Sequence, residues 1–240
     1  MELSKGIKAI DLALYIEKEK LLAITDLQLG YEGMLNAQGV MVPRFNLEKI
    51  KERLEEKIFP RAGKIEKILI NGDLKHEFGT ISEQEGAEVR EIIEFLKQRC
   101  KEIILVKGNH DAILEPIVRT KGLQLLEEYF IPAQKILFTH GHKIPESENF
   151  AKAKTIIIGH EHPCITVSDG VKRETYKCFL KGKFRGKELI VMPSMNETAL
   201  GSDISREEIL TPFISSADNF EVFAVEDKVY RMGKVKDIIE

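Results

Sequence analysis

The fold is decided by the stretch IILVKGNHD at residues 103–111, in which four apolar residues lead through a lysine into glycine, asparagine, histidine and aspartate. The apolar run Ile103–Val106 predicts a short buried strand. Gly108 follows closely and permits a sharp turn or a close backbone approach. The stretch therefore predicts a strand whose carboxyl end carries a polar, chemically capable loop.

The same order of an apolar run and a polar loop recurs four more times along the chain. The other runs are Lys20–Ile24, Ile65–Ile70, Ile136–Thr139 and Thr155–Ile158. Ligands of open α/β sheets bind outside the carboxyl ends of the strands, so we expect the five loops to meet at one site.

The loops contain oxygen and nitrogen donors and no sulfur. All six histidines of the chain lie in these segments, a distribution that scattered surface histidines would not produce. Such a mixed donor set suits Mn, Fe, Zn or Ni, and one carboxylate that bridges two ions is what a two-metal hydrolytic centre requires. His160 and His162 are one residue apart, so on an extended backbone they point the same way and contact one metal each or flank a metal pair.

The remaining patterns predict an α/β fold with a strand-rich second half. Ala9–Tyr15 is expected as one strand, and Asn46 as the N-cap of a helix that runs to about Phe59 and is closed by Pro60. Ser82 and Glu85 form a capping box for a helix to about Arg99. Further strands are expected at Ile165–Val167, Tyr176–Leu180, Glu188–Met192, Phe220–Val225 and Lys228–Met232, with turns at Asp169-Gly170 and Glu226-Asp227. We predict a four-layer α/β/β/α sandwich, with two facing mixed β-sheets and helices outside.

The totals of the sequence exclude several classes of protein. The 240 residues, 43% of them hydrophobic, predict a single domain over 1–240 with a sizeable core. The 36 basic and 39 acidic residues give no overall field for nucleic acid or membrane. Three scattered cysteines argue for a reducing compartment and against a disulfide framework. Charges interrupt the apolar runs near the start, so we expect no signal peptide or membrane helix and a cytoplasmic protein.

The chain resembles the calcineurin-like metallophosphoesterases in five ordered motifs: Asp26-x-Gln28, Gly72-Asp73-x-x-His76, Gly108-Asn109-His110-Asp111, His140-Gly141-His142 and Gly159-His160-x-His162. The resemblance implies one ion held by Asp26, Asp73 and His162, and a second held by Asp73, Asn109, His140 and His160. It also implies that His110 protonates the leaving oxygen or stabilises the phosphoryl charge. Two divalent ions are expected as cofactors, with Mn favoured and Zn, Fe or Ni left open.

Other segments resemble a compact archaeal and bacterial subgroup related to the SbcD-type DNA-repair nucleases. They are Asp26-x-x-x-Gly30-Tyr31-Glu32, residues 72–79 and residues 191–196, the last of which is expected to return to the rim of the site. A histidine at position 76 favours this subgroup, and we expect His76 to support His110. Asp111 is expected to orient a ligand.

Gln28 stands where the family usually has histidine. Either its carbonyl oxygen binds an ion such as Mn weakly, or the side chain only forms hydrogen bonds within the loop. His142 is expected to line the pocket, and Glu161 to point away as a surface or structural residue. Leu200–Phe213 is expected as a flap with a short helix around Ser205–Leu210.

The predicted function is hydrolysis of phosphodiester bonds, as a nuclease or phosphodiesterase associated with DNA repair. The alternatives are a phosphomonoesterase of small molecules, which shares the whole metal centre, and a non-catalytic scaffold. The partner is expected to be a phosphate ester, with nucleic acid and a homodimer left open and no membrane. A basic run at residues 172–187 is either a solvated face or a path for a nucleic-acid backbone.

Overall fold

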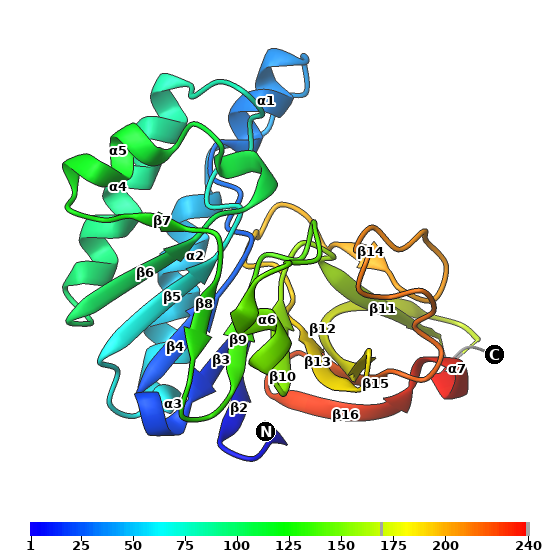
Figure 1. Ribbon diagram of the computed structural model, residues 1–240. Helices are drawn as coiled ribbons and strands as arrows, with labels where there is room; N and C mark the ends of the chain where they lie inside the picture. Colours follow the sequence, from blue (N-terminus) through cyan, green and yellow to red (C-terminus); the bar gives the residue numbers. More distant parts are fainter. Residues whose placement is uncertain (169, 239–240) are drawn as a thin grey trace.

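The computed structural model describes residues 1–168 and 170–238, and these form two mixed β-sheets that pack face to face (Figure 1). The seven strands of the first sheet lie in chain order: β1 Glu2–Ser4, β2 Ile7–Ile10, β3 Ala13–Ile16, β4 Leu21–Ile24, β5 Lys67–Asn71, β6 Glu102–Val106 and β7 Leu125–Leu126. The nine described strands of the second sheet are β8 Tyr129–Ile131, β9 Ile136–Phe138, β10 Thr155–Ile158, β11 Pro163–Ser168, β12 Arg173–Phe184, β13 Lys187–Val191, β14 Ser202–Asp203, β15 Glu221–Val225 and β16 Val229–Lys234.

Parallel pairing brings the five loops to one end of the molecule. In the first sheet β4, β5 and β6 are parallel neighbours, and in the second sheet β10 lies parallel between β9 and β13. The register keeps the strand ends level, with Ile24 opposite Ile70 and Ile158 opposite Val191. The side-chain amide of Asn71 donates to the carbonyl of Thr139 at 3.0 Å, which ties the ends of the two sheets together. Both sheets therefore contribute loops to the same edge.

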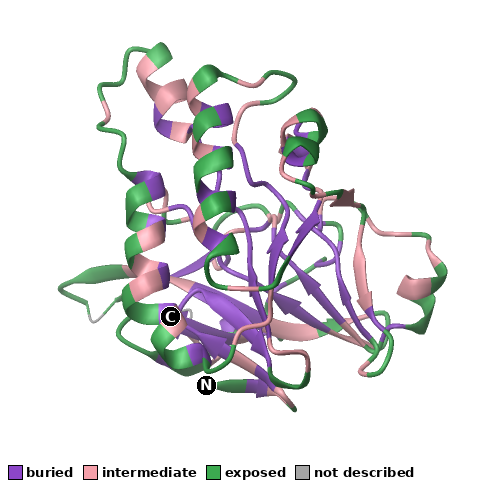
Figure 2. Ribbon diagram, turned by 90° about the vertical axis from the view of Figure 1, so that its left-hand side faces the viewer, coloured by how far each residue is buried: buried purple, intermediate pink, exposed green. Residues whose placement is uncertain are grey.

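Seven α-helices complete the described chain: α1 Tyr31–Ala37, α2 Asn46–Arg53, α3 Phe59–Ala62, α4 Glu83–Lys97, α5 Glu115–Thr120, α6 Glu148–Lys152 and α7 Val235–Ile238. Figure 2 shows exposed and half-buried helical residues in front of the buried strands of the first sheet. The capping box of α4 is confirmed, since Ser82 Oγ accepts from Glu85 N and Glu85 Oε2 accepts from Ser82 N. None of the described helices is long and apolar enough to cross a membrane.

The core has two apolar layers on either side of the second sheet. One cluster joins the first sheet and its helices to the inward side chains of the second sheet, such as Phe138, Phe179 and Phe223. The other cluster covers the outer face of the second sheet, where Phe213, Phe220 and neighbouring residues of the largely irregular segment 204–220 pack with Val235 of α7. The predicted sandwich is confirmed, although irregular chain supplies much of its last layer.

The predicted boundaries of the helix that begins near Asn46 are wrong at both ends. Asn46 is the first helical residue and caps nothing, because its Oδ1 accepts from the amide of Glu197 and its Nδ2 donates to the carbonyl of Leu27. Pro60 lies inside the continuing helix, which ends only at Ala62. A π-helical turn at Leu54–Ile58 precedes the proline and accommodates its missing N–H.

Two further element predictions are wrong. The expected strand Ala9–Tyr15 is divided between β2 and β3 by a turn in which Asp11 has a φ of 52°. No helix forms around Ser205–Leu210, because Asp203 Oδ1 accepts from the amide and hydroxyl of Ser205 and directs the chain into a turn. The expected turn at Asp169-Gly170 includes Asp169, which lies outside the described residues.

Candidate metal centre

The backbone at the five loops adopts conformations that non-glycine residues rarely take. Nine described non-glycine residues have positive φ, and five of them lie in the predicted loops, with φ between 47° and 68°: Asp26, Gln28, Asp73, His160 and His162. Such conformations persist where the surrounding structure enforces them, and they cluster at functional sites. The expectation of extended backbone at residues 160–162 is therefore wrong, and the two histidines turn to different partners.

Two glycines allow the loops to approach each other closely. Gly72 has a φ of 92°, and a Cβ at this position would collide with the ring of His140. A Cβ on Gly108 would collide with the carboxylate of Asp73. The sequence predicted a turn or close approach at both glycines. Glycine is required there because loops from different strands come into contact.

Three predicted ligands converge on one point. One ligand atom from each of Asp73, His140 and His160 lies within 4.8 Å of the others. His140 Nε2 is 3.2 Å from Asp73 Oδ2 and 3.1 Å from Asn109 Oδ1. His140 Nδ1 donates to the carbonyl of Asn71 at 3.0 Å, which fixes the ring with Nε2 towards the cluster.

A second group forms around Asp26. Its Oδ2 accepts from Thr25 Oγ1 at 2.8 Å and from the amide of His160 at 3.1 Å. Its Oδ1 is buried without a hydrogen-bond donor among the described residues and lies 3.2 Å from His162 Nε2. The two groups are neighbours, because His140 Nδ1 lies 3.8 Å from Asp26 Oδ1.

The protonation of these residues fits a cation at this place. Burial alone would lower the pKa of His140, but the carboxylate of Asp73 outweighs it and raises that pKa to about 9. Burial would raise the pKa of Asp73, but the hydrogen bond to His140 outweighs it and lowers that pKa to about 2. Burial lowers the pKa of His160 to about 4, which keeps its ring neutral. The proton on His140 thus offsets the charge of the Asp73 carboxylate at the place where a divalent ion fits. The Asp26 oxygen without a hydrogen-bond donor among the described residues also fits a cation.

His110 lies beside this cluster with one ring nitrogen fixed. Its Nδ1 donates to the carbonyl of His76, and its Nε2 is 3.7 Å from Asp73 Oδ2. The His76 ring stacks at 5.5 Å, and the Phe78 ring lies at 3.6 Å although its side chain is 61% exposed. Burial, with the neighbouring His110, lowers the pKa of His76 to about 4. The sequence placed His76 beside His110, but it gave no sign of Phe78.

Asp111 acts on backbone groups. Its Oδ2 accepts from the amide of Gly108 at 2.9 Å, and its Oδ1 accepts from the amides of Leu74 and Lys75 at 3.0 and 3.4 Å. The carboxylate is buried and therefore holds the loop after β5 against the loop after β6. His142 lies near the cluster, with its ring 5.4 Å from that of His140.

The loop after β13 returns to the site, as the sequence suggested. Ser194 Oγ donates to the carbonyl of Asp26 at 2.7 Å, and the Asn196 side-chain amide donates to Gln28 Oε1 at 3.0 Å. The metal role of Gln28 stays a prediction. Asn196 was not singled out, because its partner lies 168 residues away in the chain.

Glu161 points away from the site, as expected, and of the two alternatives it is a buried structural residue. Its Oε2 accepts from the amides of Leu210 and Thr211 at 2.9 and 2.8 Å. Thr211 Oγ1 donates to the carbonyl of Gly141 at 2.8 Å. The segment expected as a flap, residues 200–213, is therefore fastened to two histidine loops and is called the strap below.

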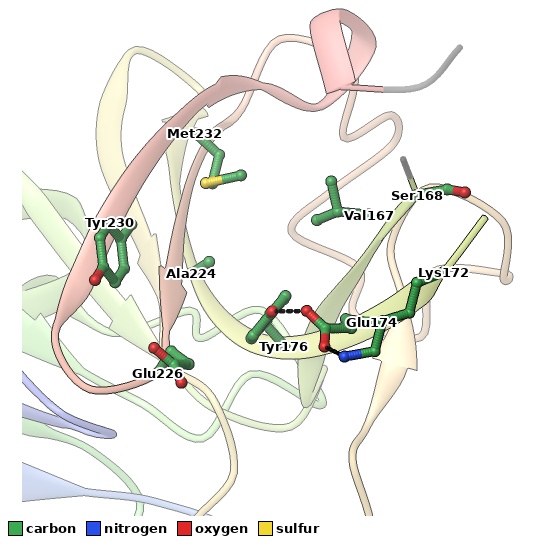
Figure 3. Close-up of a pocket in the computed structure, with 9 residues that line it drawn as sticks. All are labelled: Val167, Ser168, Lys172, Glu174, Tyr176, Ala224, Glu226, Tyr230 and Met232. Carbon is green, nitrogen blue, oxygen red and sulfur yellow. Dashed lines mark hydrogen bonds and ion pairs between the residues drawn. The ribbon is translucent and has the colours of Figure 1, made fainter. Parts of the chain in front are cut away.

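The basic run at residues 172–187 does not form one free surface. Lys177 Nζ donates to the carbonyls of Ser194 and Asn196, and Lys187 Nζ donates to the carbonyls of Ala151 and Ala153. A hollow of about 380 Å³ lies between the β11–β12 and β15–β16 hairpins, where Tyr176 donates to Glu174 (Figure 3). None of the predicted ligands lines this hollow.

Comparisons with known proteins identify the family of the chain. The model of the family described as calcineurin-like phosphoesterase matches residues 19–164, more than half of the chain. The crystal structure of Pseudomonas putida nuclease MPE is 17% identical, covers 94% of both chains and has a TM-score of 0.58, which supports the fold. Vps29 from Cryptosporidium parvum is also 17% identical over 89% of this chain and 97% of its own, with a TM-score of 0.41. No curated protein gave a match. Because the family model spans the strands and loops that build the site, the chain belongs to the calcineurin-like phosphoesterase family.

Proposed function

We propose that the protein hydrolyses phosphodiester bonds with two divalent ions, as a nuclease or phosphodiesterase. The observation that carries this proposal is the convergence of two buried carboxylates with imidazole and amide donors from both sheets. In this proposal one ion is held by Asp26, Asp73 and His162, and the other by Asp73, Asn109, His140 and His160. When bound, such ions activate a water molecule and neutralise charge on the phosphoryl oxygens.

The residues of the chain then have distinct roles. Asp73 belongs to the His140 group and would supply a carboxylate to both ions, as the resemblance implies. His110 donates a proton to the leaving oxygen from Nε2, since its Nδ1 is held by the carbonyl of His76. General-acid catalysis of this kind contributes typically ~10²–10⁴-fold. Asp111 and His76 position the loops around His110 and do not touch substrate.

The preference for diesters is supported by Phe78. Its exposed ring lies against His110, the residue that donates to the leaving oxygen in this scheme. Aromatic side chains of this kind stack on bases of single-stranded nucleic acid. The similarity in fold to a nuclease, and the segments that resemble the SbcD-related subgroup, favour the same substrate class. We propose Mn as the working metal and one cytoplasmic domain over 1–240.

The test is hydrolysis of bis-p-nitrophenyl phosphate and p-nitrophenyl phosphate by the Mn-loaded protein. We expect turnover of the diester to exceed that of the monoester, and the isosteric variant Asp73→Asn to lose both. A profile restricted to monoesters would favour the phosphomonoesterase alternative. If neither ester is hydrolysed and His110→Ala changes nothing, the scaffold alternative holds.

A further inference from the structure

We propose that Gln28 is a hydrogen-bond donor to an anionic oxygen of the substrate and is not a metal ligand, and that Asn196 fixes it in this orientation. The inference rests on the proposed function for the identity of the substrate, a phosphate ester. It concerns the position at which the sequence departs from its family and at which two roles were left open.

The orientation of the Asn196 side chain follows from its neighbour Thr198. The backbone amide of Thr198 can only donate, and it lies 2.8 Å from Asn196 Oδ1, which must therefore be the acceptor. The hydroxyl of Thr198 donates to the same oxygen. The other end of the Asn196 amide, Nδ2, is thereby the group that faces Gln28.

The orientation of Gln28 follows in turn. Because Asn196 Nδ2 can only donate, the Gln28 atom 3.0 Å from it must be the oxygen Oε1. The Gln28 amide nitrogen is then turned away from Asn196, and no described residue accepts a hydrogen bond from it. Gln28 is 8% exposed, and its unpaired amide nitrogen keeps some solvent access, so a ligand that enters the site can reach this donor. An amide donor held in one orientation without a protein acceptor is free to donate its hydrogen bond to a ligand.

The backbones of both residues are anchored to the residues that supply the two carboxylates of the site. The backbone amide of Gln28 donates to the carbonyl of Asp73 at 3.0 Å, and the backbone amide of Asn196 donates to the carbonyl of Asp26 at 3.2 Å. Two more hydrogen bonds hold the same loop. The backbone amide of Asn196 also donates to Ser194 Oγ, and Lys177 Nζ donates to the carbonyl of Ser194. The Gln28–Asn196 pair therefore has little freedom to turn over when a ligand enters.

The chemistry of the unpaired Gln28 amide nitrogen selects the ligand. An amide N–H cannot bind a cation, whereas it binds an anionic oxygen by a charge-assisted hydrogen bond. In a site rich in carboxylates, a neutral donor adds affinity for a phosphate oxygen without a competing charge. The family's usual histidine would bind an ion at this position, so the exchange for glutamine replaces a metal contact with a substrate contact.

The experiment measures two affinities by calorimetry: that of Mn²⁺ for the metal-free protein, and that of inorganic phosphate for the Mn-saturated protein. We expect Gln28→Ala to leave the Mn²⁺ affinity within about twofold and to weaken phosphate binding about tenfold or more, as for a hydrogen bond to a charged group. Gln38→Ala, an exposed glutamine at the end of α1, should change neither. Melting temperatures of the metal-free variants establish that each one folds.

The variant Asn196→Asp tests the orienting role of Asn196 in the same two measurements. A carboxylate cannot donate, so Gln28 is expected to turn over, give its amide nitrogen to the new carboxylate and present its oxygen to the site. Phosphate affinity should fall and Mn²⁺ affinity should rise, and the rise should disappear when Gln28→Ala is combined with Asn196→Asp. A rise that persists in the double variant reflects added charge alone and contradicts the orienting role of Asn196.

The inference is overturned if Gln28→Ala weakens Mn²⁺ binding tenfold while phosphate affinity of the saturated protein is unchanged. It is also overturned if the saturated wild-type protein does not bind phosphate. Failure of the proposed function is a separate result, namely wild-type protein that binds both ligands but hydrolyses no diester.

Discussion

At the scale of single residues, His110 is the group whose proposed contribution to catalysis is most distinct from the proposed metal binding. We expect His110→Gln to reduce kcat for diesters by ~10²–10⁴-fold, because the variant cannot donate a proton to the leaving oxygen. The loss should be smaller for a nitrophenolate leaving group than for an alkoxide, which needs the proton more. Steady-state kinetics with both leaving groups checks this, and Mn²⁺ affinity should be unchanged. An equal loss for both leaving groups would contradict the role of an acid.

Asp111 lies next to the same site, and its carboxylate is expected to contribute to stability and not to catalysis. Asp111→Asn replaces an oxygen by an N–H₂ group that faces backbone donors, so a buried hydrogen bond is lost and two donors oppose each other. We expect a loss of about 1–3 kcal/mol in the free energy of unfolding of the metal-free protein. Urea denaturation measures it, with Asp218→Asn, at an exposed position, as the matched control. Equal stabilities of the two variants would show that the loops do not depend on Asp111.

At the scale of elements, the strap depends on one buried carboxylate. Glu161→Ala leaves the amides of Leu210 and Thr211 without their acceptor, so the strap should detach from the histidine loops. Limited proteolysis should cut residues 201–210 faster in this variant, while Glu208→Ala, exposed on the strap itself, should behave as the wild type. Unchanged cleavage in Glu161→Ala would mean that apolar packing alone holds the strap.

Strand β12 carries a lysine that links stability to pH. Burial lowers the pKa of Lys177 from 10.5 to about 8. The folded state thus loses this proton first, and between pH 8 and 10.5 the unfolded state binds more protons, so stability should rise with pH in this window. Relative to Lys177→Met, the wild type should gain about 2–3 kcal/mol across it.

Urea denaturation of both proteins from pH 7 to 10 checks this prediction. Lys183→Met, on the same strand at an exposed position, should show no such difference. Parallel pH profiles of the wild type and Lys177→Met would contradict the shift.

At the scale of the whole molecule, local patterns predicted the strands and their loops, because each apolar run leads into its own polar loop. The α4 capping box was equally visible, since Ser82 and Glu85 lie within one turn. The contacts that orient the site were not visible. The carbonyl of Asn71 fixes His140, and Asn196 fixes Gln28, across 69 and 168 residues. Backbone carbonyls have no sequence signature, and pairings over such distances need the fold.

The failed predictions have the same origin. The absence of a helix around Ser205–Leu210 depends on Asp203 capturing Ser205 and on Glu161 binding the strap. The extended backbone expected at residues 160–162 gave way to left-handed conformations, which the surrounding loops impose. Local sequence propensity determines the backbone conformation of such segments only where tertiary contacts do not impose another one.

The central claim is that loops from both sheets hold two divalent ions with Asp73 between them. The most direct measurement is anomalous diffraction from crystals of the protein soaked in Mn²⁺. We predict two Mn²⁺ peaks, one beside Asp26 and His162 and one beside Asn109, His140 and His160, with Asp73 contacting both. The absence of both peaks from these loops, or a single ion without Asp73 as a ligand, would contradict the account.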